Sequence, residues 1–398
     1  MRIVRLACII MARVSTLRSL QFVLLLAAAL AVVAFYYFGS ENQNFSSTTR
    51  RIKLSQANHN ANRNNADLTL DTRFSQLDGS EEKETGESNA FQSKTRGDET
   101  QDQRYNILMM FTKVDKNRSL QDKFRVAMLS MVKYAQFLEG EVLVFHFVSD
   151  PASKELGEKM LQEFLTNATF KYEVLFHDVE TFTHKLFPIV EALQKHFSAG
   201  SWAYYSDAIF FLSVAMHHIL PENLTRIVQL DLDLKYRTNI RDLFKEFNHF
   251  PPGAVLGIAR EMQPVYRHTF WQYRKENPET RVGDPPPEGL PGFNSGVMLL
   301  DLAAMRASAL YNQLLDTRNV TKLADKYSVK GHLGDQDFFT MISMEHPELF
   351  YSLACGWNRQ LCTWWRDHGY RDVFQLYYRC DGPIYIYHGN CNSPIPDD

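Results

Sequence analysis

The segment Arg226–Ile240, RIVQLDLDLKYRTNI, decides how the rest of the chain can be arranged. Near its start, Ile227, Val228 and Leu230 form a short, β-branched, apolar run that is typical of a buried parallel strand. The run ends at Asp231 and Asp233, and alternate residues of an extended chain point the same way. Ligands of open α/β sheets bind at the carboxyl ends of strands. We therefore expect both carboxylates to face one ligand.

Two neighbouring carboxylates repel each other unless a divalent cation joins them. The alternative is a pair of solvated acids in a turn, and a bare Asp-x-Asp motif is common enough to make that alternative serious. The choice between a metal site and a solvated turn therefore depends on the motifs that follow in the chain.

Apolar strands alternate with amphipathic helices on the way to this segment. We expect strands at 107–112, 142–148 and 172–176, and helices at 120–135, 154–164 and 208–219, the last ending before Pro221. This alternation predicts a doubly wound α/β fold with a mostly parallel sheet and flanking helices. The chain has 398 residues, of which 45% are hydrophobic, enough for one large or two modest domains. A net charge of −3 gives no indication of nucleic-acid binding.

The amino terminus predicts a membrane anchor. An uninterrupted apolar run extends from Phe22 to Phe38, and it is preceded by Arg2, Arg5, Arg13 and Arg18. We expect residues 1–19 to be a cytoplasmic tail and 20–38 a transmembrane signal anchor, which places the rest of the chain in the lumen. A cleaved signal peptide is the alternative, but the run is longer than a usual signal core and Phe38-Gly39-Ser40 is a poor cleavage site. Residues 39–104 are polar and charged, which predicts a disordered stem before a folded domain at 105–398.

Cysteines and sequons fit a lumenal domain. Cys8 precedes the anchor, and the other cysteines crowd the last segment, where an oxidising lumen favours disulfides. Three pairings are possible, and we favour Cys355–Cys380 with Cys362–Cys391. N-glycosylation sequons begin at Asn44, Asn117, Asn167, Asn223 and Asn319.

Polar steps in the second half of the chain carry the candidate chemistry. In 292–300, GFNSGVMLL, the polar residues Asn294, Ser295 and Gly296 precede an apolar strand, although a simple turn would also explain them. In 334–337, GDQD, Gly334 or Asp335 is placed to cap a helix, but capping does not explain the neighbouring Gln336.

A late strand at 385–387 ends at His388. A lone histidine after a strand is more often structural than a ligand, yet a third ligand from far along the chain often completes a divalent site. An imidazole ligand favours Mn²⁺, with Mg²⁺ as the weaker substitute.

Taken in order, LDLD (230–233), FNSGV (293–297), GDQD (334–337) and YHG (387–389) resemble the motifs of glycosyltransferase family 8. The resemblance implies a retaining enzyme with the GT-A fold that uses a nucleotide sugar and Mn²⁺. The longer segments 260–271, 283–302 and 358–370 are similar to family members that transfer xylose. For those members the donor is UDP-xylose, and the acceptor is the terminal xylose of O-linked xylose–glucose on EGF-like repeats such as those of Notch, joined by an α-1,3 linkage. The resemblance covers Tyr105 to the carboxyl terminus and the anchor arrangement, and it implies a single-pass type II protein of the endoplasmic reticulum membrane.

The resemblance also implies roles for individual residues. Asp231, Asp233 and His388 match the metal ligands, and Asp335 and Gln336 match positions near the reacting carbon of the donor sugar. Positions that match the donor-binding site are Met110, Phe111 and Thr112 for the uridine, Asn294 and Ser295 for the sugar, and Leu232 and Gly389 beside the metal ligands.

The acceptor side and the phosphate side are less well defined by the motifs. Trp364, Trp365 and Asn390 are candidates for acceptor contact, whereas Trp271 and Tyr266 could equally be core residues. The family usually follows His-Gly with a Lys-Pro-Trp that holds the diphosphate, whereas this chain has NCNSP at 390–394. The cation that neutralises the phosphates is therefore expected from elsewhere in the chain, unless the metal does more of that work.

Retention through two inversions needs a nucleophile beneath the anomeric carbon, normally a carboxylate. The matching residue is Gln336, a neutral amide, so we expect a front-face route instead. Other readings are a family member with a different UDP-sugar donor, a lumenal sugar-binding protein without turnover, and, less favoured, a sugar nucleotidyltransferase. The last would want a glycine-rich basic loop after the first strand, which Thr112–Asp115 is not. The sequence leaves open endoplasmic reticulum against Golgi, and monomer against homodimer.

Overall fold

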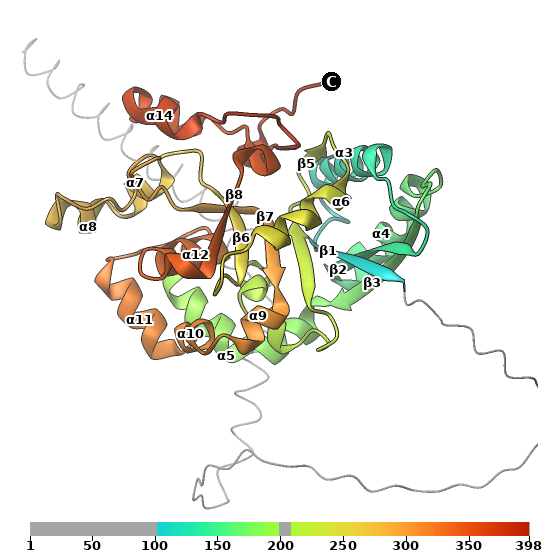
Figure 1. Cartoon of the computed structure of the whole chain (residues 1–398), viewed down its shortest axis with the longest axis horizontal. Helices are drawn as coiled ribbons and strands as arrows, with labels where there is room; N and C mark the ends of the chain where they lie inside the picture. Colours follow the sequence, from blue (N-terminus) through green and yellow to red (C-terminus); the bar gives the residue numbers. More distant parts are fainter. Residues whose placement is uncertain (1–101, 199–207, 398) are drawn as a thin grey trace, which may run out of the picture.

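The computed structural model describes residues 102–198 and 208–397 (Figure 1). The predicted tail, anchor and stem lie outside the described residues. Within the described part of the chain, no helix has both the length and the apolar character needed to cross a membrane.

The described residues form a seven-stranded sheet with the order β3-β2-β1-β4-β7-β6-β8. Adjacent strands are parallel from β3 to β4 and between β6 and β8, and β7 alone in this sheet runs antiparallel to its neighbours β4 and β6. The predicted α/β fold with a mostly parallel sheet is confirmed. The strands are β1 Gln103–Phe111, β2 Glu141–Ser149, β3 Lys171–Asp178, β4 Arg226–Leu230, β5 Leu234–Tyr236, β6 Leu256–Arg260, β7 Phe293–Asp301, β8 Phe350–Leu353, β9 Arg359–Gln360 and β10 Ile386–His388.

Helices cover both faces of this sheet, as Figure 1 shows. The α-helices are α3 Arg118–Tyr134, α4 Pro151–Phe164, α5 Val179–Phe197, α6 Ile240–Leu243, α7 Val265–Thr269, α8 Trp271–Glu276, α9 Leu302–Ala307, α10 Ala309–Leu314, α11 Thr317–Lys326, α12 Asp335–Ser343, α13 Trp364–Asp367 and α14 Arg371–Tyr378. The 3₁₀ helices are η2 Ala208–Val214, η3 Met216–His218, η4 Phe244–His249, η5 Pro347–Leu349, η6 Cys355–Asn358 and η7 Asn390–Asn392.

Alternate residues of the central strands enter two separate cores. In β4, Val228 and Leu230 pack in the core under α3 and α4, whereas Ile227 packs in the core formed with α5 and with α9 to α12. The β7 residues Leu299 and Leu300 divide between the two cores in the same way. Because both faces are buried, the central strands are continuously apolar rather than alternating.

A second, three-stranded sheet has the order β5-β10-β9. In it, His388 of β10 pairs with Leu234 of β5 on one side and with Gln360 of β9 on the other. This small sheet carries the carboxyl-terminal segment to the end of β4. The predicted disulfides Cys355–Cys380 and Cys362–Cys391 are both present and lie in the same segment.

Two local expectations differ from the structure. The segment expected as one helix over 208–219 forms the successive 3₁₀ helices η2 and η3. Nearly every residue of η2 is buried, and an all-round apolar segment has no amphipathic period that would identify the type of helix. Asp231 and Asp233 lie in a bend between β4 and β5 rather than in an extended strand.

Candidate functional site

A cleft of about 330 Å³ lies at the carboxyl ends of β1 and β4. It contains most of the residues that the sequence singled out. Its lining includes Met110, Thr112, Asp231, Leu232, Asp233, Asn294, Ser295, Asp335, Gln336, Trp365, His388 and Asn390. Segments that are far apart in the sequence therefore meet at the place where ligands of open α/β sheets bind.

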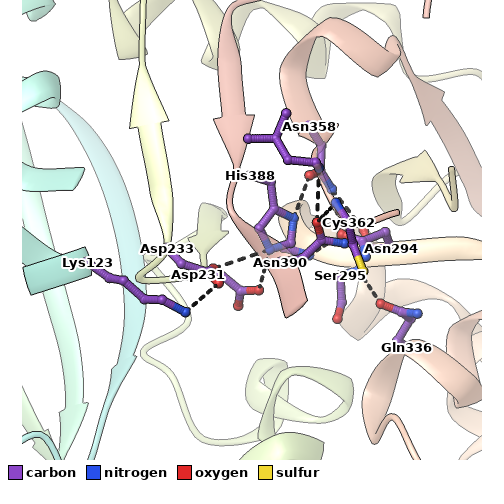
Figure 2. A network of polar contacts seen from close by, with 12 residues as sticks. Lys123, Asp231, Asp233, Asn294, Ser295, Gln336, Asn358, Cys362, His388 and Asn390 are labelled. Carbon is purple, nitrogen blue, oxygen red and sulfur yellow. Dashed lines mark hydrogen bonds and ion pairs between the residues drawn. The ribbon is translucent and has the colours of Figure 1, made fainter. Parts of the chain in front are cut away.

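Asp231, Asp233 and His388 converge in this cleft (Figure 2). One ligand-type atom from each residue lies within 4.8 Å of the other two. His388 Nε2 lies 3.4 Å from Asp231 Oδ2 and 3.3 Å from Asp233 Oδ1. The bend between β4 and β5 thus brings the two carboxylates together with the imidazole. Two carboxylates and an imidazole are a donor set that suits a divalent cation such as Mn²⁺.

A glycine of β7 makes room for the imidazole. A Cβ on Gly296 would lie only 2.3 Å from His388 Cε1. The carbonyl oxygen of Gly296 also accepts a hydrogen bond of 2.9 Å from the backbone N–H of Asp231. The FNSGV motif therefore has a packing role next to the acidic bend, and any larger residue at 296 would displace His388.

The three groups change one another's protonation. Burial disfavours a charged His388, but Asp233 and Asp231 outweigh it and raise the pKa of this imidazole to about 10. Burial likewise opposes the charge on Asp233, yet His388 and Lys123 bring the pKa of that carboxyl down to about 2. The bend therefore holds negative charge that attracts a cation, with the His388 proton as the present counter-charge.

His388 is held by a second polar residue. Its Nδ1 lies 2.9 Å from Asn358 Oδ1, and both side chains are buried. Since an amide oxygen can only accept, Nδ1 carries the proton in this contact and Nε2 faces the carboxylates. This is the usual way in which proteins orient a metal-binding histidine.

Gln336 lies deep in the cleft at the start of α12. Its Oε1 accepts a hydrogen bond of 3.2 Å from the backbone N–H of Ser295, and its Nε2 lies 3.3 Å from Oε2 of Glu261. The Glu261 carboxylate also accepts from Asn294 Nδ2 at 3.2 Å. Burial raises the pKa of Glu261 to about 7, against the opposing effect of its hydrogen bonds.

Asp335 is buried beside Gln336, where Ser213 of η2 donates a hydrogen bond to its Oδ2. Burial is the main cause that raises the pKa of Asp335 to about 7. Helix α12 is capped by Gly334, which has a φ of 70° and no capping side chain. The alternative in which Asp335 serves as the cap is therefore wrong.

The last residue of the GDQD motif supports the loop before α12. Asp337 Oδ2 accepts hydrogen bonds of 2.6 and 2.7 Å from the backbone N–H groups of His332 and Leu333. Asp337 Oδ1 accepts one of 2.9 Å from the hydroxyl of Tyr266, which is 1% exposed. Tyr266 is accordingly a core residue, and its hydroxyl faces Asp337.

The predicted uridine residues divide between the two faces of the sheet. Met110 and Thr112 line the cleft, whereas the Phe111 side chain is fully buried among Phe124 and Phe147 on the other face. Strand alternation alone produces this division. Phe111 can therefore contribute only backbone atoms to a ligand in the cleft.

Lys123 of α3 reaches the same cleft and was not singled out from the sequence. Its Nζ lies 3.4 Å from Asp233 Oδ2 (Figure 2). The same Nζ donates a hydrogen bond of 2.8 Å to Asn392 Oδ1. Among the described residues that line the cleft, it is the one lysine or arginine. Its helix carries no motif, so only its spatial position identifies it, together with the missing lysine after His388.

The candidate acceptor residues lie at one rim. Trp365 lines the cleft, and Trp364 is half-exposed and stacks on His368 at 3.6 Å between ring centroids. Asn390 lines the cleft too, but its Oδ1 already accepts from the backbone N–H groups of Leu361 and Cys362. Gly389 donates its N–H to the carbonyl of Asp233, and the exposed Trp271 is not part of the cleft lining.

A larger hollow of about 710 Å³ lies at the opposite ends of the strands, beside the first residues of β1 and β4. Each lysine or arginine that lines it is paired with an acid: Arg104 with Glu173, Arg226 with Asp301, Arg241 with Glu141 and Lys245 with Asp242. Its charges are already neutralised, and the potential metal ligands of the described residues lie in the smaller cleft. The smaller cleft is therefore the better candidate site.

Comparison with known proteins gives one consistent result. The chain is 60% identical over 389 residues to xyloside xylosyltransferase 1 of Mus musculus. The aligned region covers 98% of this chain and 97% of that protein. It is 59% identical to xyloside xylosyltransferase 1 of Homo sapiens over the same shares. The fold matches the crystal structure of the mouse xyloside xylosyltransferase 1 in its apo form with a TM-score of 0.71 and 68% identity, over 74% of this chain and 100% of that chain. Residues 108–369 match Glycosyl transferase family 8. With the acidic bend, the buried amides and the distant histidine gathered in one cleft, the chain belongs to glycosyl transferase family 8.

Proposed function

We propose that the chain is a retaining xylosyltransferase that uses UDP-xylose. In this proposal it adds xylose in α-1,3 linkage to the terminal xylose of O-linked xylose–glucose on EGF-like repeats. The observation that carries the proposal is the convergence of Asp231, Asp233 and His388 beside Gln336, in a chain 60% identical to xyloside xylosyltransferase 1. Each potential metal ligand is present, which argues against a sugar-binding protein that has lost turnover.

The donor set fits a divalent metal. Asp231, Asp233 and Nε2 of His388 would hold it, and Asn358 and Gly296 keep the imidazole in place for that purpose. The imidazole favours Mn²⁺ over Mg²⁺. When bound, the metal would neutralise charge that develops on the leaving diphosphate.

Lys123 is our candidate for the second positive charge on the diphosphate. Its ammonium lies on the metal-facing carboxylate Asp233, and Asn392 of the NCNSP segment holds it there. A phosphate group would compete with Asp233 for this ammonium once Asp233 turns to the metal. The lysine that the family carries after its His-Gly would then be replaced by one from a different helix.

The surroundings of the carboxylates favour a front-face route. Asp335 is buried and accepts from Ser213, and both oxygens of Glu261 accept from neighbouring donors. Gln336 is neutral. On this route the diphosphate departs first and the departing phosphate oxygen takes the acceptor's proton, on the same face. The Gln336 amide oxygen would stabilise positive charge on the sugar, a contact that strengthens in the transition state.

A donor screen tests the proposal. Purified protein, Mn²⁺ and a panel of UDP-sugars would be assayed for UDP release, with and without an EGF-like repeat that carries xylose–glucose. We expect acceptor-dependent release from UDP-xylose. Release from UDP-glucose or UDP-galactose instead would favour a family member with another donor, and UDP-sugar binding without any release would favour the non-catalytic alternative.

We also propose a single-pass type II protein of the endoplasmic reticulum membrane, anchored by residues 20–38 with its catalytic domain in the lumen. The disulfides Cys355–Cys380 and Cys362–Cys391 support an oxidising compartment. Asn167 and Asn223 are exposed, whereas Asn319 is partly buried and donates its Nδ2 to the carbonyl of Gln313. Enzymatic removal of N-glycans should shift the band on a gel, and an unglycosylated protein in the cytosol would contradict this topology.

A further inference from the structure

A continuous chain of buried hydrogen bonds leads away from His388. Nδ1 of His388 contacts Asn358 Oδ1, and Asn358 Nδ2 donates to Asn294 Oδ1 at 2.9 Å. Asn294 Nδ2 then donates to Glu261 Oε2 at 3.2 Å. The four side chains are between 0 and 6% exposed, so water does not compete for these contacts. Such a series of hydrogen bonds runs in one direction from donor to acceptor, because each amide must place its NH₂ toward an acceptor and its oxygen toward a donor.

This series of hydrogen bonds ends at Glu261. An ionised carboxylate has no proton to donate, so it can act only as an acceptor. Oε2 of Glu261 receives hydrogen bonds from Asn294 and from Gln336, and Oε1 receives one of 3.1 Å from the backbone N–H of Gln263. A backbone N–H cannot reverse its role. Glu261 therefore has donors on both oxygens, which an ionised carboxylate satisfies and a carboxamide cannot.

Glu261 fixes two amides of the site at once. With their NH₂ groups toward Glu261, Asn294 turns its oxygen to the backbone N–H of Gly296, and Gln336 turns its oxygen to that of Ser295. Asn358 must then present its NH₂ to Asn294 and its oxygen to His388. The same direction continues to the imidazole, whose proton is held on Nδ1.

We propose that Glu261 is a positioning residue for both ends of the cleft. Through Asn294 and Asn358 it keeps His388 Nε2 free for the metal. By its direct hydrogen bond with Gln336 it keeps Gln336 Oε1 toward the donor sugar. The proposal rests on the metal site and donor site of the proposed function. It goes beyond them because it assigns the positioning of both sites to one buried carboxylate that forms no hydrogen bond with any of the three metal ligands. Glu261 thereby couples the metal end of the cleft to the sugar end.

The decisive variant is Glu261→Gln. If its oxygen faces Asn294 and Gln336, its NH₂ meets the N–H of Gln263; if it turns round, its NH₂ meets the two amide NH₂ groups. A flip of Asn294 or Gln336 gives no relief, because its NH₂ would then meet the backbone N–H of Gly296 or Ser295. The hydrogen bonds that hold Asn358 against His388 are therefore weakened rather than reversed. Mn²⁺ binding, measured in the presence of UDP by electron paramagnetic resonance of free Mn²⁺, should weaken about tenfold or more. The kcat should fall as well, because the NH₂ of Gln336 loses its carboxylate acceptor.

The control is Glu141→Gln, at the far end of β2. Glu141 is also a buried carboxylate with several donors, from Arg241, Tyr105 and the backbone of Leu138. This variant should lose stability yet bind Mn²⁺ like the wild type. A purely structural role for Glu261 would give the two variants the same pattern.

A shorter carboxylate provides the conservative variant. Glu261→Asp keeps an acceptor-only group near Asn294 and Gln336, whereas Glu261→Gln brings in an NH₂ that neither amide can accept. Mn²⁺ affinity in Glu261→Asp should stay within about threefold of wild type, and its kcat should exceed that of Glu261→Gln.

The outcomes are separable. If Glu261→Gln keeps the Mn²⁺ affinity and the kcat of the wild type, the role of Glu261 is overturned and the proposed function stands. If the wild-type protein does not bind Mn²⁺, the proposed metal site itself is overturned. If Glu261→Gln does not fold, Glu261→Asp must fold and bind Mn²⁺. Failure of Glu261→Asp to do so overturns the inference.

Discussion

The two ends of the large sheet differ in how their charges are arranged. At the amino ends of the strands, the cations that line the hollow each have an acid as a partner, as in Arg241 with Glu141. At the carboxyl ends, Asp231, Asp233, Glu261 and Asp335 share a cleft with Lys123 and His388 as the cationic groups among the described residues. One end consists of matched acid–base pairs, whereas the other gathers four carboxyl groups around one lysine and His388.

Hydrogen bonding shows the same difference. In the cleft, Gln229 Oε1 and Gln263 Oε1 are buried with no hydrogen-bond partner in the described structure. A buried acceptor without a partner costs free energy, of the order of 1–3 kcal/mol, that a ligand hydroxyl or N–H can recover. Among the described residues, the lining of the cleft has such acceptors and the lining of the hollow has none, which favours the cleft as the ligand site.

Removing a metal ligand should produce the largest loss. Asp231→Asn and Asp233→Asn each take one negative charge from the acidic bend, and we expect kcat/KM to fall about 10³-fold or more, roughly 4 kcal/mol. His388→Ala should cause nearly as great a loss. Activity of chelated protein should return best with added Mn²⁺. Full activity in the presence of a chelator would show that the cleft at the carboxyl ends of the strands needs no metal.

Gln336→Ala should come next. We expect kcat to fall about 10²-fold, near 3 kcal/mol, with the Kd for the donor little changed, because the amide acts mainly in the transition state. Gln336→Glu should not give a faster enzyme. A glycosyl adduct trapped on Asp335 or Gln336 of the wild type would replace the front-face route with a double displacement.

Lys123→Gln should have a smaller effect, on binding. We expect the Kd for UDP with Mn²⁺ to rise about tenfold, roughly 1.4 kcal/mol, and the difference from wild type to grow at low salt. Arg226→Gln is the matched control, because it removes the same charge from the amino-end hollow, where Arg226 pairs with Asp301. An equal loss of UDP affinity in both variants would mean a general effect of net charge.

Arg241→Gln should have the smallest effect on transfer. It breaks the contact with Glu141, so thermal unfolding should show a loss of about 2 kcal/mol. The kcat per folded molecule should remain that of the wild type, since Arg241 lies at the neutralised end. A large change in kcat would show that the amino-end hollow is coupled to the cleft.

The sequence by itself determined the features that depend on neighbouring residues. The apolar run before Asp231 predicts its strand, and the strand–helix alternation predicts the mostly parallel sheet. The crowding of cysteines in one segment predicts two disulfides, and the favoured one of the three possible pairings is the one that the structure has. The motifs also identified many of the residues that line the cleft, whereas Phe111, Trp364 and Gly389 do not line it. These features depend on hydrophobic period, turn chemistry and covalent reach, which are local properties of a chain.

Only the tertiary structure could identify Lys123, Glu261 and Asn358. Lys123 lies in a helix with no motif, and the segments 260–271 and 358–370 resemble family members without giving Glu261 or Asn358 a role. Each of the three matters because a distant group lies within hydrogen-bonding distance: Asp233 for Lys123, Gln336 for Glu261 and His388 for Asn358. The 3₁₀ conformation of η2 was likewise hidden, because a segment buried on all sides carries no period. Periodicity reports which face of an element is buried, whereas the partner of a buried polar group is set by how the elements pack.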